Sequence, residues 1–95
     1  MKERLENKII ELIKLLDAMA IGHRFSSYNK VKNNYSKLLE LIKIKNQDEI
    51  TEEDFDIIQN CIRMVLEAPP KDYLSGINVL NKMQEIYDIQ TELLN

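Results

Sequence analysis

The sequence predicts an all-α protein, a single-domain antiparallel four-helix bundle. Apolar side chains recur at steps of three and four residues, and the 95 residues include only two glycines and two prolines. The length suits one small domain. Because small β-sandwiches and barrels need a turn every ~8–12 residues, so few turn-forming residues favour long helices with short connections. A three-helix arrangement with one peripheral segment is the main alternative.

The first two predicted helices span about residues 2–21 and 28–45. Each has one apolar face, on which side chains recur every three or four positions. We expect Gly22 to close the first helix in a left-handed conformation and Ser27 to cap the start of the second. The expected core residues are Leu5, Ile9, Leu12, Leu16 and Met19 in the first helix, and Tyr28, Val31, Tyr35, Leu38 and Ile42 in the second.

The third predicted helix spans about residues 52–67. Its start is the clearest local signal, because Thr51 and Asp54 have the spacing of a capping box. Two consecutive prolines, Pro69 and Pro70, stop this helix, since a proline ring disfavours a helical residue before it and removes an amide donor. The residues expected to face inward are Phe55, Ile58, Cys61, Ile62 and Val65.

The fourth predicted helix spans about residues 71–94. The sequence does not fix its first residue, because Gly76 lowers the stability of a helix by roughly 1 kcal/mol relative to alanine. Either Gly76 permits a close backbone approach or the helix begins only after Ser75. The main apolar stripe, which we expect to face the core, consists of Tyr73, Ile77, Leu80, Met83, Tyr87 and Leu94.

The same helix carries a second apolar stripe on its flank. Val79, Ile86 and Leu93 recur at intervals of seven, and Ile89 lies beside them. Surplus apolar surface on a helix is buried either inside the monomer or against a partner. Both alternatives are open at the level of sequence. A symmetric homodimer is the simplest partner, since two-fold dimers are the commonest assemblies.

Charge is distributed unevenly along the chain, although the net charge is only −3. Residues 23–45 carry six cations against one acid, a net charge of +5, whereas residues 46–72 carry eight acids against two cations, a net charge of −6. We interpret Lys30 and Lys37 on the second helix as charges that steer a partner. The acidic balance disfavours nucleic acid, because most nucleic-acid binders are basic.

The sequence has no set of residues that supports catalysis, a cofactor or a metal site. One histidine, His23, and one cysteine, Cys61, cannot form an internal disulfide or a structural zinc site. The acids between Asp48 and Asp56 lack the ligand spacing and central glycine of a calcium loop. No apolar stretch approaches the ~20 residues that cross a bilayer, and no signal segment is evident. We expect a cytoplasmic protein that is not an enzyme and uses neither cofactor nor small-molecule substrate.

These patterns favour a small helical interaction module that binds another protein or a second copy of itself. Regulators, inhibitors and immunity-type proteins of a bacterial mobile element or phage fit this description. The alternative is a nucleic-acid-binding module that uses the lysine- and asparagine-rich second helix. The predicted partner-binding residues are Val79, Ile86, Ile89 and Leu93, with Lys30 and Lys37 as the steering charges.

Overall fold

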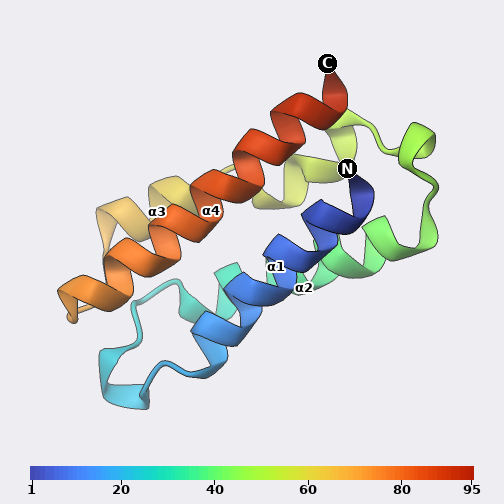
Figure 1. Ribbon diagram of the computed structural model, residues 1–95. Coiled ribbons are helices and arrows are strands. Elements are labelled where there is room, and N and C mark those ends of the chain that lie inside the picture. Colours follow the sequence, from blue (N-terminus) through green and yellow to red (C-terminus); the bar gives the residue numbers. More distant parts are fainter.

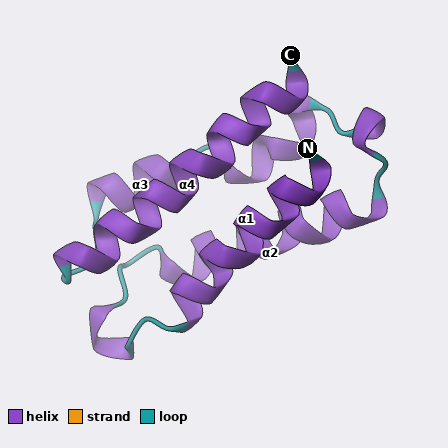
Figure 2. Cartoon of the chain, in the orientation of Figure 1, coloured by secondary structure: helices purple, strands orange, loops and turns teal.

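The computed structural model describes residues 1–95 as helices joined by turns, with no strand (Figure 1, Figure 2). The all-α helical bundle predicted from the sequence is therefore confirmed. Four elements are α-helices: α1 (Lys2–Asp17), α2 (Tyr28–Ile44), α3 (Cys61–Glu67) and α4 (Tyr73–Leu94). Three shorter elements are 3₁₀-helices: η1 (Ile21–His23), η2 (Gln47–Glu49) and η3 (Glu52–Ile58).

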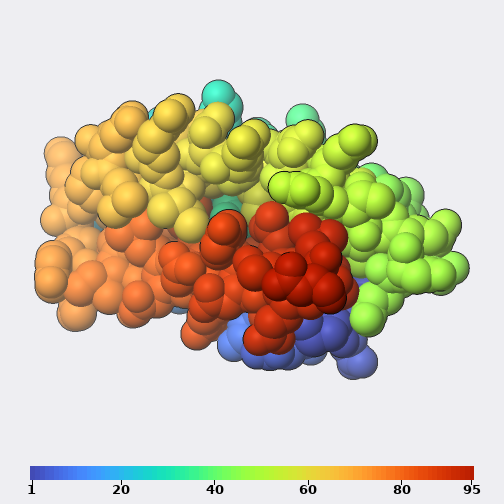
Figure 3. Space-filling model, turned by 90° about the horizontal axis from the view of Figure 1, so that it is seen from above, coloured from blue at the N-terminus to red at the C-terminus, as the bar shows by residue number.

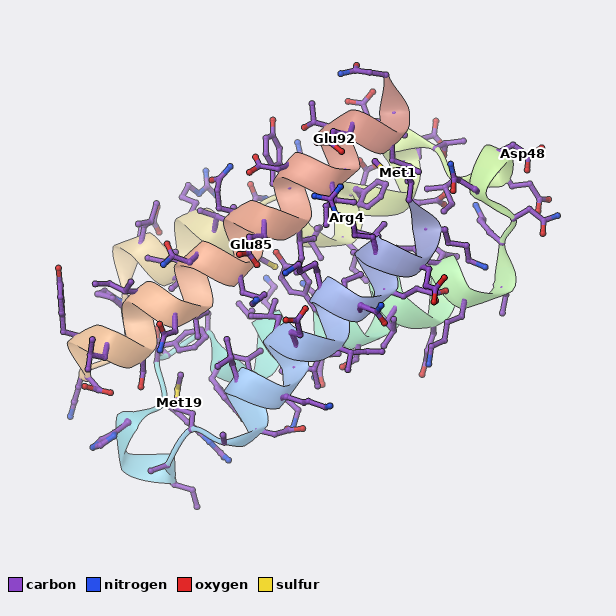
Figure 4. All side chains as sticks on the ribbon, in the orientation of Figure 1. Met1, Arg4, Met19, Asp48, Glu85 and Glu92 are labelled. Atoms are coloured by element: carbon purple, nitrogen blue, oxygen red, sulfur yellow. The ribbon has the colours of Figure 1, made fainter.

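The elements run alternately up and down the long axis of the molecule (Figure 1). Helix α1 packs against both α2 and α4, α2 packs against η3, and α3 packs against α4. An ion pair of 3.3 Å between Arg4 Nη1 and Glu92 Oε2 joins the start of α1 to the end of α4 (Figure 4). Another, of 2.7 Å between Lys45 Nζ and Asp54 Oδ1, joins the end of α2 to the start of η3. Neighbouring helical segments are thus antiparallel, and η3 and α3 together form the third segment of the bundle.

One cluster of 20 buried apolar side chains forms the core. All ten residues predicted to face inward from the first two helices belong to it. No polar or charged residue is buried with them. The bundle is therefore held together by the removal of apolar surface from water, which contributes about 25 cal/mol for each Å² buried.

Helix α1 ends at Asp17, four residues before the predicted boundary. The predicted left-handed closure at Gly22 is wrong, because Gly22 lies in η1 and has no positive φ. The Leu16 carbonyl instead accepts a hydrogen bond from the Met19 amide at 3.1 Å and from the Tyr28 hydroxyl at 2.6 Å. A longer helix would have used this carbonyl for the amide of Ala20. The Tyr28 hydroxyl thus helps to satisfy a carbonyl group at the end of α1.

Helix α2 begins at the predicted residue and ends one residue before the predicted boundary. Ser27 is the N-cap residue, but its side chain makes no capping hydrogen bond, so the predicted Ser27 cap is wrong. The backbone of Ser27 has φ −92° and ψ 12°, whereas an N-cap side chain ordinarily reaches the helix amides from an extended backbone.

The capping box predicted at Thr51 is formed at the start of η3, and the Thr51 amide donates to Asp54 Oδ2 at 2.9 Å.

The third predicted helix is divided into η3 and α3, with Gln59 and Asn60 between them. The prediction of one continuous helix over residues 52–67 is therefore wrong. The buried residues Phe55, Ile58 and Cys61 follow one another at steps of three, which is the period of a 3₁₀-helix. An α-helix turns these positions progressively away from one face. The step of four from Cys61 to Val65 then returns the chain to α-helical geometry.

Helix α4 starts at Tyr73, which decides between the alternatives left open by the sequence. Asp72 caps it, since Asp72 Oδ2 accepts hydrogen bonds from the Ser75 amide at 3.3 Å and the Ser75 hydroxyl at 2.6 Å. Gly76 is buried inside the first turns of the helix and faces Pro70. The loop after α3 therefore packs directly against the start of α4.

Candidate functional site

The predicted partner-binding stripe of α4 lies in the core. Val79 and Ile89 are each 1% exposed and Ile86 is 0% exposed, while Leu93 is partly buried against the same cluster. The interpretation of these four residues as an exposed partner-binding surface is therefore wrong. Helix α4 contacts both α1 and α3, and these neighbours cover the arc of α4 on which the stripe lies.

The stripe that was predicted to face the core is only partly buried. Tyr73 is 77% exposed and Tyr87 is 52% exposed, and only Met83 of the predicted stripe is buried. Leu80 and Leu94 of this stripe are partly buried and pack against the core, so both arcs of α4 contribute to it and the flank stripe is the more deeply buried.

A groove lies between η3 and α4, with a volume of about 300 Å³. Figure 3 shows it as a hollow between the yellow segment of η3 and α3 and the orange-to-red segment of α4. We call it the η3–α4 groove. Its apolar lining consists of Tyr35, Phe55, Ile58, Ile62, Met83 and Tyr87. Its polar lining consists of Glu52, Asp56, Gln59 and Gln90.

The local structure of both walls explains why the groove is there. On the α4 side, Met83, Tyr87 and Gln90 follow one another at steps of four and three and so form one line along the helix. On the other side, the 3₁₀ geometry of η3 stacks residues three apart in a narrow ridge. The floor is supplied by Tyr35 of α2, whose pKa is raised above its ordinary value because burial disfavours the charged phenolate.

A second hollow, of about 240 Å³, continues the groove toward the end of α4. Both hollows are lined by Glu52 of η3 and by Tyr87 and Gln90 of α4, so that they adjoin at these residues. We call the two together the extended groove. The additional lining residues are Thr91, Leu94 and Asn95.

The acids of the groove are not neutralised by the chain itself. Glu52 and Asp56 form no ion pair, and no lysine, arginine or histidine lines either hollow. Asp54, another of the four acids of η3, differs because it pairs with Lys45. Burial of Asp54 raises its pKa, but hydrogen bonds from Lys45 and the Thr51 amide outweigh this effect and lower the pKa below its usual value.

The charged side chains at the seam between α1 and α4 are paired, in contrast to the acids of the groove. Lys82 Nζ lies 2.9 Å from Glu85 Oε2 and 3.3 Å from Glu11 Oε1, and Lys8 lies within ion-pair distance of the same two acids. The hydrogen bond from Lys82 lowers the pKa of Glu85, and that of Lys82 is raised in turn. Charges at this seam are therefore satisfied within the monomer, whereas those of the groove face solvent.

The predicted steering charges are on the surface of α2. Lys30 and Lys37 are both exposed and form no ion pair. Two other lysines of residues 23–45 form ion pairs, since Lys32 pairs with Asp17 and Lys45 pairs with Asp54. The free basic surface of α2 is therefore smaller than the count of lysines in the sequence indicates.

Side chains with reactive chemistry are dispersed or buried. No group of three or more His, Cys, Asp or Glu side chains could hold a metal ion. Cys61 is buried, and burial raises the pKa of its thiol, although Asn34 and the charge of Lys30 act in the opposite direction. A thiol in such surroundings behaves as a small apolar side chain.

A second group of exposed apolar residues lies at the end of the bundle where η1 and the α3–α4 junction meet (Figure 1). It comprises Ile21, Leu66, Tyr73 and Leu74. None of these four residues lines a hollow of the kind formed between η3 and α4. The η3–α4 groove is therefore the stronger candidate site.

Comparison of the chain with protein-family models, with curated proteins and with solved structures found no match. No helix of the structure is at once long and apolar enough to cross a membrane.

Proposed function

We propose that this chain is a small helical protein-interaction module that binds a partner protein through the η3–α4 groove. The observation that carries the proposal is the groove that the bundle leaves open beside the half-exposed ring of Tyr87. Aromatic side chains in partly covered apolar sites are enriched among the anchors of protein interfaces. A regulator or inhibitor that acts by occupying its partner would use such a surface.

The size of the groove favours side chains of a partner over a small molecule. Ligand pockets generally enclose ~300–1,000 Å³ and bury most of the ligand. The η3–α4 groove is at the lower end of this range, at about 300 Å³, and lies open along the surface (Figure 3). Such a groove suits a few apolar side chains that are presented by another chain.

The nucleic-acid alternative rests on Lys30 and Lys37, which are free to meet phosphates. Lys43 of α2 is also exposed and forms no ion pair, but three charges still give a small footprint, because specific and non-specific nucleic-acid binding both depend on the number of phosphates neutralised. The pairing of Lys32 with Asp17 and of Lys45 with Asp54 reduces this footprint further. Protein binding is therefore the function we propose.

The test compares two tyrosines of the same helix. Tyr73 and Tyr87 are both exposed on α4, but only Tyr87 lines the groove. The chain and its Tyr87→Glu and Tyr73→Glu variants would be tagged and used to capture proteins from cells that naturally express it, after thermal unfolding has shown that all three are folded. We expect a partner that is retained by the chain and by Tyr73→Glu and is lost with Tyr87→Glu. Equal capture by all three would refute the groove as the binding surface.

A further inference from the structure

We infer that the extended groove receives an amphipathic helix of a partner protein that carries lysine or arginine beside its apolar face. This inference rests on the proposed function and specifies the chemistry of the partner. An amphipathic helix binds a groove by placing apolar side chains at positions i, i+3, i+4 and i+7 into it. The extended groove offers the length and the lining that this mode of binding requires.

The length of the extended groove is given by α4, the helix that forms one of its walls. The extended groove follows α4 from Met83 to Asn95. At 1.5 Å per residue, this part of α4 is about 18 Å long, which matches roughly three turns of a second helix. Tyr87 and Leu94 supply accessible apolar surface of α4 along this length, and Gln59 and Gln90 also line the groove.

The positive charge of the partner helix is inferred from η3, which forms the opposite wall of the groove. Glu52 and Asp56 are exposed on η3 and have no cationic partner within the chain. A helix that covered them without bringing cations would remove two carboxylates from water uncompensated, which is costly. A partner with lysine or arginine at these places forms ion pairs instead and is attracted before contact.

The same charges disfavour a symmetric dimer through this surface. A two-fold interface sets a surface patch against its own copy. Glu52 and Asp56 would then approach Glu52 and Asp56 of a second copy, and like charges would repel each other. The partner that best complements the groove is therefore a different, basic segment.

The experiment uses two labelled peptides of about 18 residues with identical leucine positions on one helical face. One carries lysine on the other face and the second carries glutamate. Fluorescence anisotropy would measure their binding to the full chain at low and high salt. We expect the lysine peptide to bind, with affinity that falls as salt rises, and the glutamate peptide to bind at least about tenfold more weakly.

Two pairs of variants locate the binding. The double variant Glu52→Gln, Asp56→Asn should weaken the lysine peptide about tenfold. The double variant Glu3→Gln, Glu40→Gln removes the same net charge from exposed acids outside the groove and should leave binding nearly unchanged. Likewise, Tyr87→Ala should weaken binding, whereas Tyr73→Ala should not.

Several results would overturn the inference. These are no binding of the lysine peptide, equal binding of the glutamate peptide, or equal loss in both double variants. Concentration-dependent dimerisation that Tyr87→Glu abolishes would also overturn it, in favour of a second copy. If the peptides fail but a cellular protein is still captured through Tyr87, only the chemistry assigned to the partner is wrong. If Tyr87-dependent capture fails as well, the proposed function fails with it.

Discussion

The hydroxyl group of Tyr28 donates a hydrogen bond of 2.6 Å to the carbonyl oxygen of Leu16, at the buried junction of α1 and α2. This carbonyl lies in the last turn of α1, where carbonyl groups have no amide partner four residues on. The Tyr28 ring also meets Phe25 edge-on at 5.8 Å and has the guanidinium of Arg24 4.4 Å from its centroid. One side chain therefore closes α1 and orders the turn that follows it.

Tyr28→Phe should lower the free energy of unfolding by about 1 kcal/mol, because it removes the hydrogen bond while keeping the ring. Urea unfolding followed by circular dichroism would measure the loss. Tyr73→Phe is the matched control, since Tyr73 is exposed and should show no change. Equal stability of Tyr28→Phe and the unmodified chain would show that the hydroxyl contributes nothing to closing α1.

Ile86→Ala should lower the free energy of unfolding by about 2–5 kcal/mol, because it leaves a cavity in the core. Tyr87→Ala, one residue along the same helix, should cost less than about 1 kcal/mol, since the ring is half exposed. Chemical unfolding of both variants checks the assignment of the two arcs of α4. A larger loss in Tyr87→Ala would mean that the predicted main stripe faces the core after all.

Asp54 should make the stability of the fold depend on acid. Its folded-state pKa is lowered, so its contribution is present above the unfolded value of about 3.9 and is lost as pH falls through the folded value. Asp54→Asn should therefore be less stable than the unmodified chain at neutral pH, and the difference should shrink toward about pH 3. Thermal unfolding of both proteins at several pH values measures this difference in stability. A difference that stays constant with pH contradicts the assignment.

Gly76→Ala should stabilise the protein. A Cβ built at Gly76 would lie 3.5 Å from Pro70 Cδ, an ordinary van der Waals distance, and the glycine has no positive φ. Alanine inside a helix is favoured over glycine by about 1 kcal/mol, so the melting temperature should rise. Gly22→Ala, outside the α-helices, serves as the comparison and should gain less. A fall in melting temperature for Gly76→Ala would mean that Pro70 cannot accommodate the methyl group.

The acids of η3 show why local sequence patterns do not predict the η3–α4 groove. Asp54 has the capping-box spacing from Thr51, whereas nothing in the local spacing of Glu52 and Asp56 marks them as residues that line a groove. Asp54 meets Lys45, whereas the other two border a groove whose second wall is about 30 residues further along the chain. The steps of three from Phe55 to Cys61 were the one local sign that this segment is not an ordinary α-helix.

The sequence by itself determined the helical class, the inward faces of α1 and α2, and the capping box at Thr51. These features depend on periodicity and on hydrogen bonds between residues a few positions apart. Only the tertiary structure decided where α1 ends, that η3 and α3 are separate, and which arc of α4 is covered. Burial around a helix depends on where neighbouring helices pack. A helix with two apolar arcs does not itself contain that information.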